Sequence, residues 1–241
     1  MILITGHRGF IGSYLFAELS KSHDVTGLDI KDGQDIHRIR DFPPAAVVFH
    51  LAAQTSVIDS VSDPLQDATD NILMTIRILR AYPNAKIIYT ASGGASEQEE
   101  LGSPYGLSKM TGGHYLNLLH QNVVICNLSN VFGPGGKGVI ERFLSEPVLT
   151  IYGSGNQTRD FVYVEDMVEG LIKAMDWPAG VYFMGAGREV SVKGLVEATN
   201  KTCVYVPKRK GEIERSVLTN TTPNWKPKVD VIDYLREKIH A

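Results

Sequence analysis

The sequence predicts an α/β protein built on a doubly wound parallel sheet, and three observations support this. Short apolar segments alternate with helical patterns through the first half of the chain. A glycine-rich turn directly follows the first apolar segment, at residues 6–12. From residue 133 onward the elements become shorter and glycine more frequent, which predicts a small C-terminal α/β lobe.

The predicted elements follow one another as strand, helix and strand. They are, in order, a strand ending at Thr5, a helix from Phe10, strands at 24–30 and 46–51, a helix at about 64–82, a strand at 86–90, a helix at about 104–120 and a strand at 123–128. The helix at 64–82 carries Leu65, Ala68, Ile72, Ile76 and Leu79 on one face, and Pro83-Asn84 ends it. This order is typical of right-handed crossovers between parallel strands.

Two segments beyond residue 133 are expected to return to the sheet, a helix near 164–175 and a strand at 180–184. We therefore expect a dinucleotide-binding domain of Rossmann type at 1–132, to which 161–185 return. Residues 133–160 and 186–241 would form an abridged substrate-binding lobe. Ligands of open parallel sheets bind beyond the carboxyl ends of the strands, so the cleft should lie between sheet and lobe.

Composition limits the classes of function. The chain has 241 residues, is 43% hydrophobic and 21% charged, and carries a net charge of −3, which gives no reason to expect a nucleic-acid or membrane partner. Its two cysteines, Cys126 and Cys203, stand in no metal-binding or disulfide pattern, so no metal is expected and a reducing cytoplasm fits best. The sequence contains no apolar segment as long as a membrane span.

The glycine-rich turn predicts a dinucleotide site. Gly6 allows a tight turn, Gly9 lets the backbone approach a pyrophosphate, and Gly12 lets the following helix pack closely on the strand. Asp29 ends the second strand 17 residues after Gly12, where an acid accepts hydrogen bonds from the adenosine ribose. A carboxylate there repels a 2'-phosphate, so NAD is favoured over NADP, although Arg8 could partly offset this.

Tyr105 and Lys109 stand four residues apart at the start of a predicted helix, so both side chains lie on one face. A phenol with an ordinary pKa of about 10 is a weak base at neutral pH. A neighbouring ammonium and the positive ring of oxidised nicotinamide both favour phenolate, which makes Tyr105 a candidate general base.

These motifs, in order along nearly the whole chain, resemble the extended short-chain dehydrogenase/reductases. The segments that carry the resemblance are residues 5–12 (TGHRGFIG), 50–53 (HLAA), 103–109 (SPYGLSK), 130–135 (NVFGPG) and 159–166 (RDFVYVED). They are most similar to the NAD-dependent nucleotide-sugar epimerase/dehydratases, of the UDP-glucose 4-epimerase type, in a compact version. Residues 224–228 (NWKPK) resemble the closing motif of the family, with Asn224 in place of glycine.

The resemblance implies roles for individual residues. Besides Gly6, Gly9, Gly12 and Asp29, it places the cofactor against Phe10, Ile11, Asp35, Ile36, Leu51, Ala52, Ala53, Asn71, Tyr105 and Lys109. It makes Ser92, Tyr105 and Lys109 the catalytic residues, with Ser92 also contacting the sugar. It assigns the remaining substrate contacts to Asn130, Arg159, Arg209 and Glu212.

The reaction that the resemblance implies is C4 epimerisation through a transient keto sugar. Phenolate Tyr105 would take the hydroxyl proton of the sugar while its hydride passes to the cofactor, and the hydride would then return to the other face. Two alternatives stay open, a 4,6-dehydratase or decarboxylase and a non-catalytic protein that binds NAD and nucleotide sugar. The family often pairs its helices at 64–82 and 104–120 into a dimer, which Leu116, Leu118 and Leu119 would allow.

The sequence departs from the family pattern in three places. Gly93 and Gly94 follow Ser92, where dehydratases and decarboxylases commonly carry an acid, and glycine supplies no acid or base. Glu97, Glu99 and Glu100 lie just beyond and could reach in, although consecutive glutamates usually form a solvated loop. Only 12 residues separate Ser92 from Tyr105, and the lobe is short, so the cofactor would be more exposed than usual.

Overall fold

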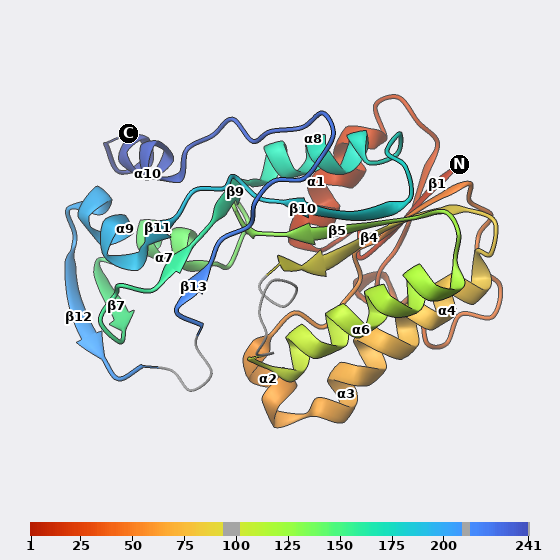
Figure 1. The fold of residues 1–241 in the computed structure, drawn as a ribbon, viewed down its shortest axis with the longest axis horizontal. Helices are drawn as coiled ribbons and strands as arrows, with labels where there is room; N and C mark the ends of the chain where they lie inside the picture. Colours follow the sequence, from red (N-terminus) through yellow and green to blue (C-terminus); the bar gives the residue numbers. More distant parts are fainter. Residues whose placement is uncertain (94–101, 209–212, 241) are drawn as a thin grey trace.

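A six-stranded parallel sheet organises the molecule (Figure 1). The computed structural model describes residues 1–93, 102–208 and 213–240. The strands of this sheet are β1 (Ile2–Thr5), β2 (Val25–Leu28), β3 (Val47–His50), β4 (Lys86–Ser92), β5 (Val123–Leu128) and β10 (Gly180–Met184). Their order is β10-β5-β4-β3-β1-β2, and every neighbouring pair is parallel. The predicted doubly wound fold is therefore confirmed.

The chain leaves β1 toward β2 on one side and later returns to β3 on the other, so the strand order reverses at β1. Crossover chains leave the sheet on opposite faces at such a point and open a crevice beyond the carboxyl ends of the strands. The residues that end β1, β3 and β4, which are Thr5, His50 and Ser92, lie along this edge.

Helices cover both faces of the sheet (Figure 1). One face carries α1 (Phe10–Leu19) and α8 (Val164–Lys173), which pack on each other and on an apolar cluster that includes Ile4, Leu15 and Leu171. The other face carries α6 (Pro104–Leu119) beside a long helical stretch. This stretch consists of α3 (Pro64–Ala68), the π-helical turn η2 (Thr69–Leu73) and α4 (Met74–Ala81).

Two short helical elements were not predicted. Helix α2 (Val57–Ser62) begins at Ser56, whose hydroxyl accepts a hydrogen bond of 3.1 Å from the Asp59 amide. The 3-10 turn η1 (Ile30–Asp32) begins at Asp29, whose carboxylate accepts from the Lys31 amide. With six and three residues, both are too short for a periodic pattern, so only their N-cap residues could have indicated them.

The apolar face predicted for the helix at 64–82 is not its buried face. Leu65 is 78% exposed, whereas the residues buried against the sheet and α6 include Asp67, Asn71, Thr75 and Ile78. The π-helical turn inserts an extra residue and rotates the face of the residues that follow it, which the regular 3.6-residue period does not allow for. The buried face of this helix therefore combines polar side chains with the apolar side chains of Met74 and Ile78.

The far end of the molecule is made of short elements (Figure 1). They are β6 (Asn130–Phe132), α7 (Val139–Ser145), β7 (Val148–Tyr152), β8 (Thr158–Arg159), β9 (Phe161–Tyr163), β11 (Val190–Ser191), α9 (Val192–Thr199), β12 (Thr202–Val206), β13 (Arg215–Ser216) and α10 (Val231–His240). The strands pair as β6-β9, β7-β12 and β11-β8-β13. A separate core that includes Phe132, Phe143 and Leu195 holds them together.

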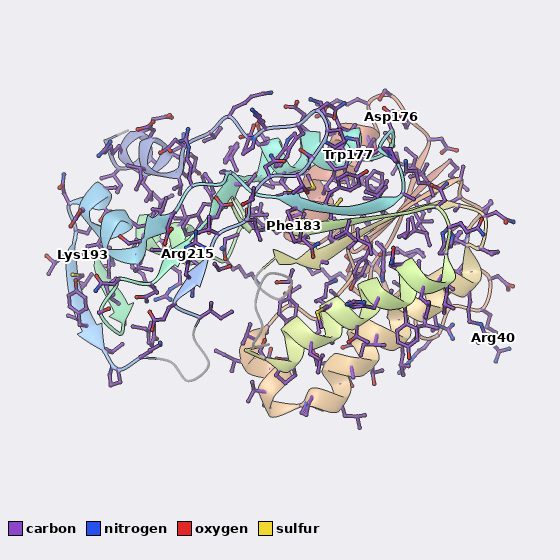
Figure 2. All side chains as sticks on the ribbon, in the orientation of Figure 1. Arg40, Asp176, Trp177, Phe183, Lys193 and Arg215 are labelled. Atoms are coloured by element: carbon purple, nitrogen blue, oxygen red, sulfur yellow. The ribbon has the colours of Figure 1, made fainter. Side chains whose placement is uncertain are left out.

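The segment after β13 runs back along the sheet. Thr221 exchanges two hydrogen bonds with Phe183 of β10, at 3.1 and 2.9 Å, and Trp225 is buried against the apolar cluster under α8. Figure 2 shows Phe183 and Trp177 at this side of the sheet, and the indole of Trp177 donates to Asn224 Oδ1 at 2.9 Å. Among the described residues, no helix has the length and apolar character that crossing a bilayer requires.

Candidate functional site

The three glycines of the loop at 6–12 stand where an added side chain would meet backbone. Gly6 lies at φ +74°, and a Cβ there would be 2.8 Å from the Ala52 amide nitrogen. A Cβ on Gly12 would be 2.1 Å from the Gly6 carbonyl oxygen, and one on Gly9 would be 3.0 Å from the same atom. The loop therefore presents bare backbone at the start of α1, where free amides favour an anion such as a pyrophosphate.

Asp29 lies beside this loop, as predicted, and only 7% of it is exposed. Its Oδ2 accepts a hydrogen bond of 2.9 Å from the Arg8 amide, and its Oδ1 accepts from the Lys31 amide. The Arg8 guanidinium instead pairs with Asp32 at 2.7 Å. Because Arg8 already has a carboxylate partner, it offers less compensation for a 2'-phosphate than the sequence alone allowed.

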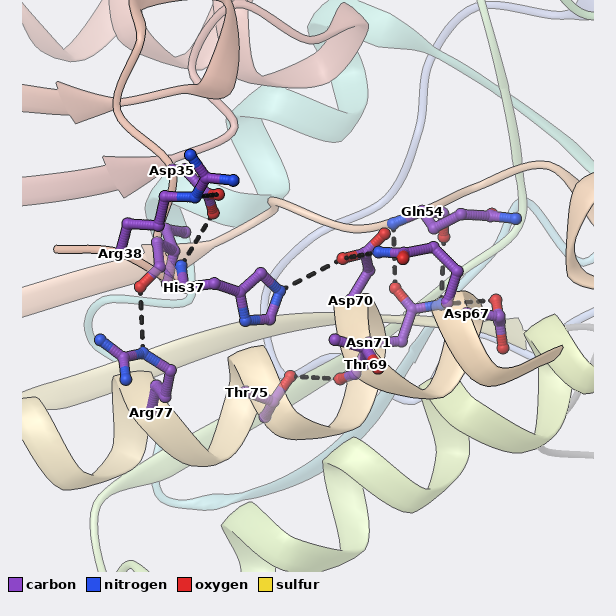
Figure 3. Close-up of polar contacts among 12 residues, drawn as sticks. Asp35, His37, Arg38, Gln54, Asp67, Thr69, Asp70, Asn71, Thr75 and Arg77 are labelled. Carbon is purple, nitrogen blue, oxygen red and sulfur yellow. Dashed lines mark hydrogen bonds and ion pairs between the residues drawn. The ribbon is translucent and has the colours of Figure 1, made fainter. Parts of the chain in front are cut away.

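The residues expected beside the adenine differ from each other in exposure. Asp35 is partly exposed and accepts from the His37 amide at 2.9 Å. Ile36 is 4% exposed and packs in the core under α4, so its contact with the adenine stays a prediction. The Arg77 guanidinium fixes the segment by donating to the carbonyl oxygens of Ile36 and Ile39. Figure 3 shows Arg77 beside this segment, near His37 and Arg38.

The segment after β3 lies across the glycine loop. The Ala52 amide donates to the Thr5 hydroxyl at 3.2 Å, which ties the HLAA segment with Leu51 and Ala53 to the end of β1. Gln54 exchanges hydrogen bonds with Asn71, at 3.0 and 3.1 Å. Its Oε1 is buried without a partner among the described residues, so a hydrogen-bond donor on a bound ligand would satisfy it.

Ser92, Tyr105 and Lys109 come together at the carboxyl edge of the sheet. Ser92 ends β4, and Ser103 caps α6 by accepting from the Gly106 amide, which places Tyr105 in the first turn. The Ser92 side chain is hydrogen-bonded to the Tyr105 phenol. Lys109 follows one turn later and is only 3% exposed, with Nζ lying 4.4 Å from the centre of the Tyr89 ring.

Burial dominates the electrostatics of this cluster. It raises the pKa of Tyr105, an effect that the Ser92 hydrogen bond opposes. It lowers the pKa of Lys109 to about 7, an effect that the charge of Asp67 opposes. In the chain alone Tyr105 therefore stays a phenol, and its deprotonation needs additional positive charge near the oxygen.

A buried polar chain connects this cluster to the end of β1. Both ring nitrogens of His50 are hydrogen-bonded to hydroxyl groups. Nδ1 lies 2.8 Å from the Thr5 hydroxyl, and Nε2 lies 3.1 Å from the Thr75 hydroxyl. Burial lowers the pKa of His50 to about 3, so the ring is neutral. Thr75 in turn donates to the Asn71 carbonyl oxygen at 2.7 Å (Figure 3).

Sequence reasoning missed Asp67, which is 1% exposed and accepts a hydrogen bond of 3.0 Å from Asn71. The signal was present, because Asp67, Asn71 and Thr75 stand four residues apart and so share one helix face. A row of polar residues at this spacing, opposite an apolar row, indicates a helix that faces a polar site.

The substrate-side residues lie where the small sheets meet the main one. Asn130 is exposed, and its side-chain nitrogen donates to the Asp160 carbonyl oxygen at 3.0 Å. Arg159 is partly exposed and donates to the Thr158 carbonyl oxygen at 2.7 Å. Arg209 and Glu212, together with Gly94, Glu97, Glu99 and Glu100, lie outside the described residues.

Fold and site together define a dinucleotide-dependent enzyme with a Ser-Tyr-Lys centre at the switch point of its sheet. The profile of the NAD dependent epimerase/dehydratase family matches residues 2–185. The chain belongs to this family. The family and the NAD cofactor predicted from the motifs are confirmed.

Relatives of known name support this assignment. UDP-glucose 4-epimerase of Mycolicibacterium smegmatis is 32% identical over 306 positions, which cover 98% of this chain and 96% of the relative. Two solved structures cover 99% of this chain and are themselves covered to 97%. They are UDP-glucose 4-epimerases from Thermotoga maritima with UDP-glucose (TM-score 0.84, 29% identity) and from Thermus thermophilus with NAD (TM-score 0.83, 28% identity).

The alignment with the mycobacterial relative extends over more positions than the 241 residues of this chain. The relative therefore contains segments that this chain lacks. The compact form predicted from the short connection after Ser92 and the short lobe agrees with this.

Proposed function

We propose that the protein is an NAD-dependent epimerase that inverts C4 of a nucleotide-diphosphate sugar of the UDP-glucose/UDP-galactose type. The observation that carries this proposal is the Ser92-Tyr105-Lys109 cluster at the edge of the sheet, beside a glycine loop that only a phosphate-bearing cofactor needs. A purely non-catalytic binding protein has no use for a buried lysine beside a hydrogen-bonded tyrosine.

The chain's own residues hold and polarise the reacting sugar. The Ser92 hydroxyl and the Tyr105 phenol, already hydrogen-bonded to each other, would share the C4 oxygen, and Tyr105 would remove its proton. Lys109 would stabilise the resulting phenolate through its charge. When bound, NAD supplies a hydride acceptor and a positive ring that favours phenolate. The glycine loop and Asp29 would hold it, with Ala52, Ala53 and Asn71 along the rest of its length.

Gly93 favours epimerisation over dehydration or decarboxylation. A Cβ at this position would lie 2.1 Å from the Leu218 side chain and 2.8 Å from the Leu128 carbonyl oxygen. A side chain at the position that commonly carries an acid in family dehydratases would therefore require the Leu128 backbone and the Leu218 side chain to shift. Because glycine supplies no proton donor at this position, reversible oxidation and reduction at C4 are favoured over elimination of water.

We also propose the division of labour in the chain. Residues 1–132 with 161–185 would hold NAD. Residues 133–160 with 186–241 would hold the substrate diphosphate and nucleotide through Arg159, Arg209 and Glu212, together with Asn130 at the end of the first part. Phe143, Leu149 and Leu195 of this lobe share a core into which Phe132 of the first part also packs. The free cysteines Cys126 and Cys203 agree with the expected cytoplasmic location.

We expect the purified protein to interconvert UDP-glucose and UDP-galactose, or their N-acetylated forms, without added reductant. A time course followed by NMR would show an isomer of equal mass, and the cofactor would not be consumed. A lighter keto sugar would identify a dehydratase instead. Formation of no isomer across a broad nucleotide-sugar panel would refute the proposal.

We propose that the protein is a homodimer that pairs through the outer face of α2, α3 and α6. Large apolar side chains are exposed on this face, with Leu118 at 79%, Leu65 at 78% and Ile58 at 74%. A hollow of about 450 Å³ between α3 and α6, lined in part by Ile72 and Leu107, lies on the same face. Apolar surface of this kind indicates a protein contact. Leu116, expected at this interface, is instead fully buried in the core.

Sedimentation should show a dimer for the unmodified chain and a monomer for the double variant Leu65→Glu, Leu118→Glu. Burying two unpaired carboxylates on each protomer of a symmetric interface costs far more free energy than the apolar contact contributes. Val204→Glu is the matched control, because Val204 is 48% exposed on β12, away from this face, and this variant should remain dimeric. A monomeric unmodified chain would contradict the proposal.

A further inference from the structure

Asp67 is a buried carboxylate beside the proposed catalytic residues, with no role in the reaction as proposed above. It lies on α3, is 1% exposed, and faces α6 rather than solvent. Burying a carboxylate is costly unless hydrogen bonds or a positive charge compensate. The contacts of Asp67 therefore show which groups compensate for its burial.

One set of contacts is a chain of hydrogen bonds that leads to Tyr105 (Figure 3 shows its Asp67 end). Asn71 Nδ2 donates to Asp67 Oδ1 at 3.0 Å and to Ser108 Oγ at 2.9 Å. Ser108 Oγ in turn donates to the Tyr105 carbonyl oxygen at 3.1 Å. Asp67 is thus connected to the first turn of α6, which carries Tyr105 and leads into the turn with Lys109.

The other contact is electrostatic. The Lys109 ammonium is buried, and the charge of Asp67 raises the pKa that burial lowers. The groups that face Lys109 from the surrounding elements are Asp67 on α3, Tyr105 on α6, Tyr89 on β4 and the neutral ring of His50 on β3. Burial keeps Tyr89 protonated as well, because it raises the pKa of this phenol. The compensating negative charge for Lys109 therefore comes from Asp67.

We propose that Asp67 is a positioning residue for the Tyr105-Lys109 pair, holding the Lys109 ammonium charged and, through Asn71 and Ser108, orienting the first turn of α6. The proposal rests on the proposed catalytic roles of Tyr105 and Lys109. It predicts where along the pH scale the pair works. A negative charge opposes loss of a proton from either group, so Asp67 raises the pKa of both Lys109 and Tyr105.

Loss of the Asp67 charge should move the pH profile of kcat to lower pH. The active form needs Tyr105 able to give up its proton and Lys109 still protonated, which produces a bell-shaped profile of kcat against pH. Removing the charge of Asp67 lowers both pKa values, so both limbs move to lower pH. A charge close to a titratable group typically shifts the pKa of that group by about one unit. The value of kcat on the alkaline limb should therefore fall about tenfold in the variant.

The test is the variant Asp67→Asn, which keeps the shape and can still accept the hydrogen bond from Asn71. We expect its pH profile of kcat to move to lower pH, and Asp67→Glu to restore the original position. Asp70→Asn is the matched control, since it removes the same charge from the next turn, where Asp70 faces His37 at 3.2 Å. Its profile should not move. A uniform loss of kcat in Asp67→Asn, with both limbs in place, would overturn the proposal.

A second variant and a titration test the role of Asp67 even if Asp67→Asn does not fold or the protein has no epimerase activity. If Asp67→Asn does not fold, Asp67→Ser removes the charge while retaining a hydroxyl acceptor, and its profile must move in the same direction. If the unmodified protein epimerises nothing, the proposed function fails, but the proposal on Asp67 is still tested. Ultraviolet titration of phenolate in the NAD complex, with Tyr105→Phe subtracted, must show a lower midpoint in Asp67→Asn. An unchanged midpoint would refute it.

Discussion

Replacing Tyr105 with phenylalanine should lower kcat for epimerisation by about 10³-fold while NAD binding is retained. A positioned general base contributes roughly 10²- to 10⁴-fold, and phenylalanine has no oxygen to accept the proton. The ring itself stays in the first turn of α6, so the packing around Ser92 should survive. The measurement is kcat by NMR product assay, together with the Kd for NAD by calorimetry.

Tyr115→Phe is the matched control, because Tyr115 lies on the same helix and is 39% exposed. It loses the same hydroxyl and should retain full activity. Activity of Tyr105→Phe equal to that of the unmodified chain would refute the role of Tyr105 as base. A loss of NAD binding together with activity would point to a structural role instead.

Replacing Gly12 with alanine should weaken NAD binding by roughly 100-fold and leave the purified protein largely without cofactor. The added Cβ would lie 2.1 Å from the Gly6 carbonyl oxygen, which is backbone and cannot rotate away. Helix α1 and the loop must therefore move apart by about 1 Å, and the free amides at the helix start no longer converge on the pyrophosphate. Calorimetry and the ratio of absorbance at 260 and 280 nm measure the effect.

A graded series makes this result specific. Gly9→Ala, whose Cβ would lie 3.0 Å from the same oxygen, should weaken binding less than Gly12→Ala. Gly113→Ala is the control. Gly113 lies within α6, and a Cβ there would make an ordinary contact of 3.6 Å with the Tyr89 side chain of β4. Alanine also favours helix over glycine by about 1 kcal/mol. Equal NAD affinity in Gly12→Ala and Gly113→Ala would show that the loop does not hold the cofactor.

The fold was predictable because its signals are local. Most strands of the main sheet are short apolar runs, such as β1 and β5, and Ser103 caps α6 where the sequence indicates a helix start. The small sheets were not predictable in the same way. Strands β8, β11 and β13 contain two residues each, too few for any period, and their pairing depends on contacts between distant segments.

The site was predictable in part for the same reason. The glycine loop, the Tyr105-Lys109 spacing and Asp29 each lie within one turn or one crossover, so sequence distance indicates spatial arrangement. The buried position of Ile36 and the removal of Leu116 from the outer face were not predictable. Ile36 follows η1 and Leu116 lies on α6, and which side of each segment packs against the core depends on contacts with distant parts of the chain.

The sequence by itself determined the doubly wound fold, the family and the residues proposed to carry the chemistry, because local patterns of residue spacing indicate all three. Only the tertiary structure decided the pKa values of these residues. Burial lowers the pKa of Lys109 to about 7, and Asp67, 42 positions earlier in the chain, opposes this shift. The Leu218 side chain, more than a hundred residues from Gly93 in sequence, occupies space that a Cβ on Gly93 would need. Such effects depend on distance through space, which the order of residues does not specify.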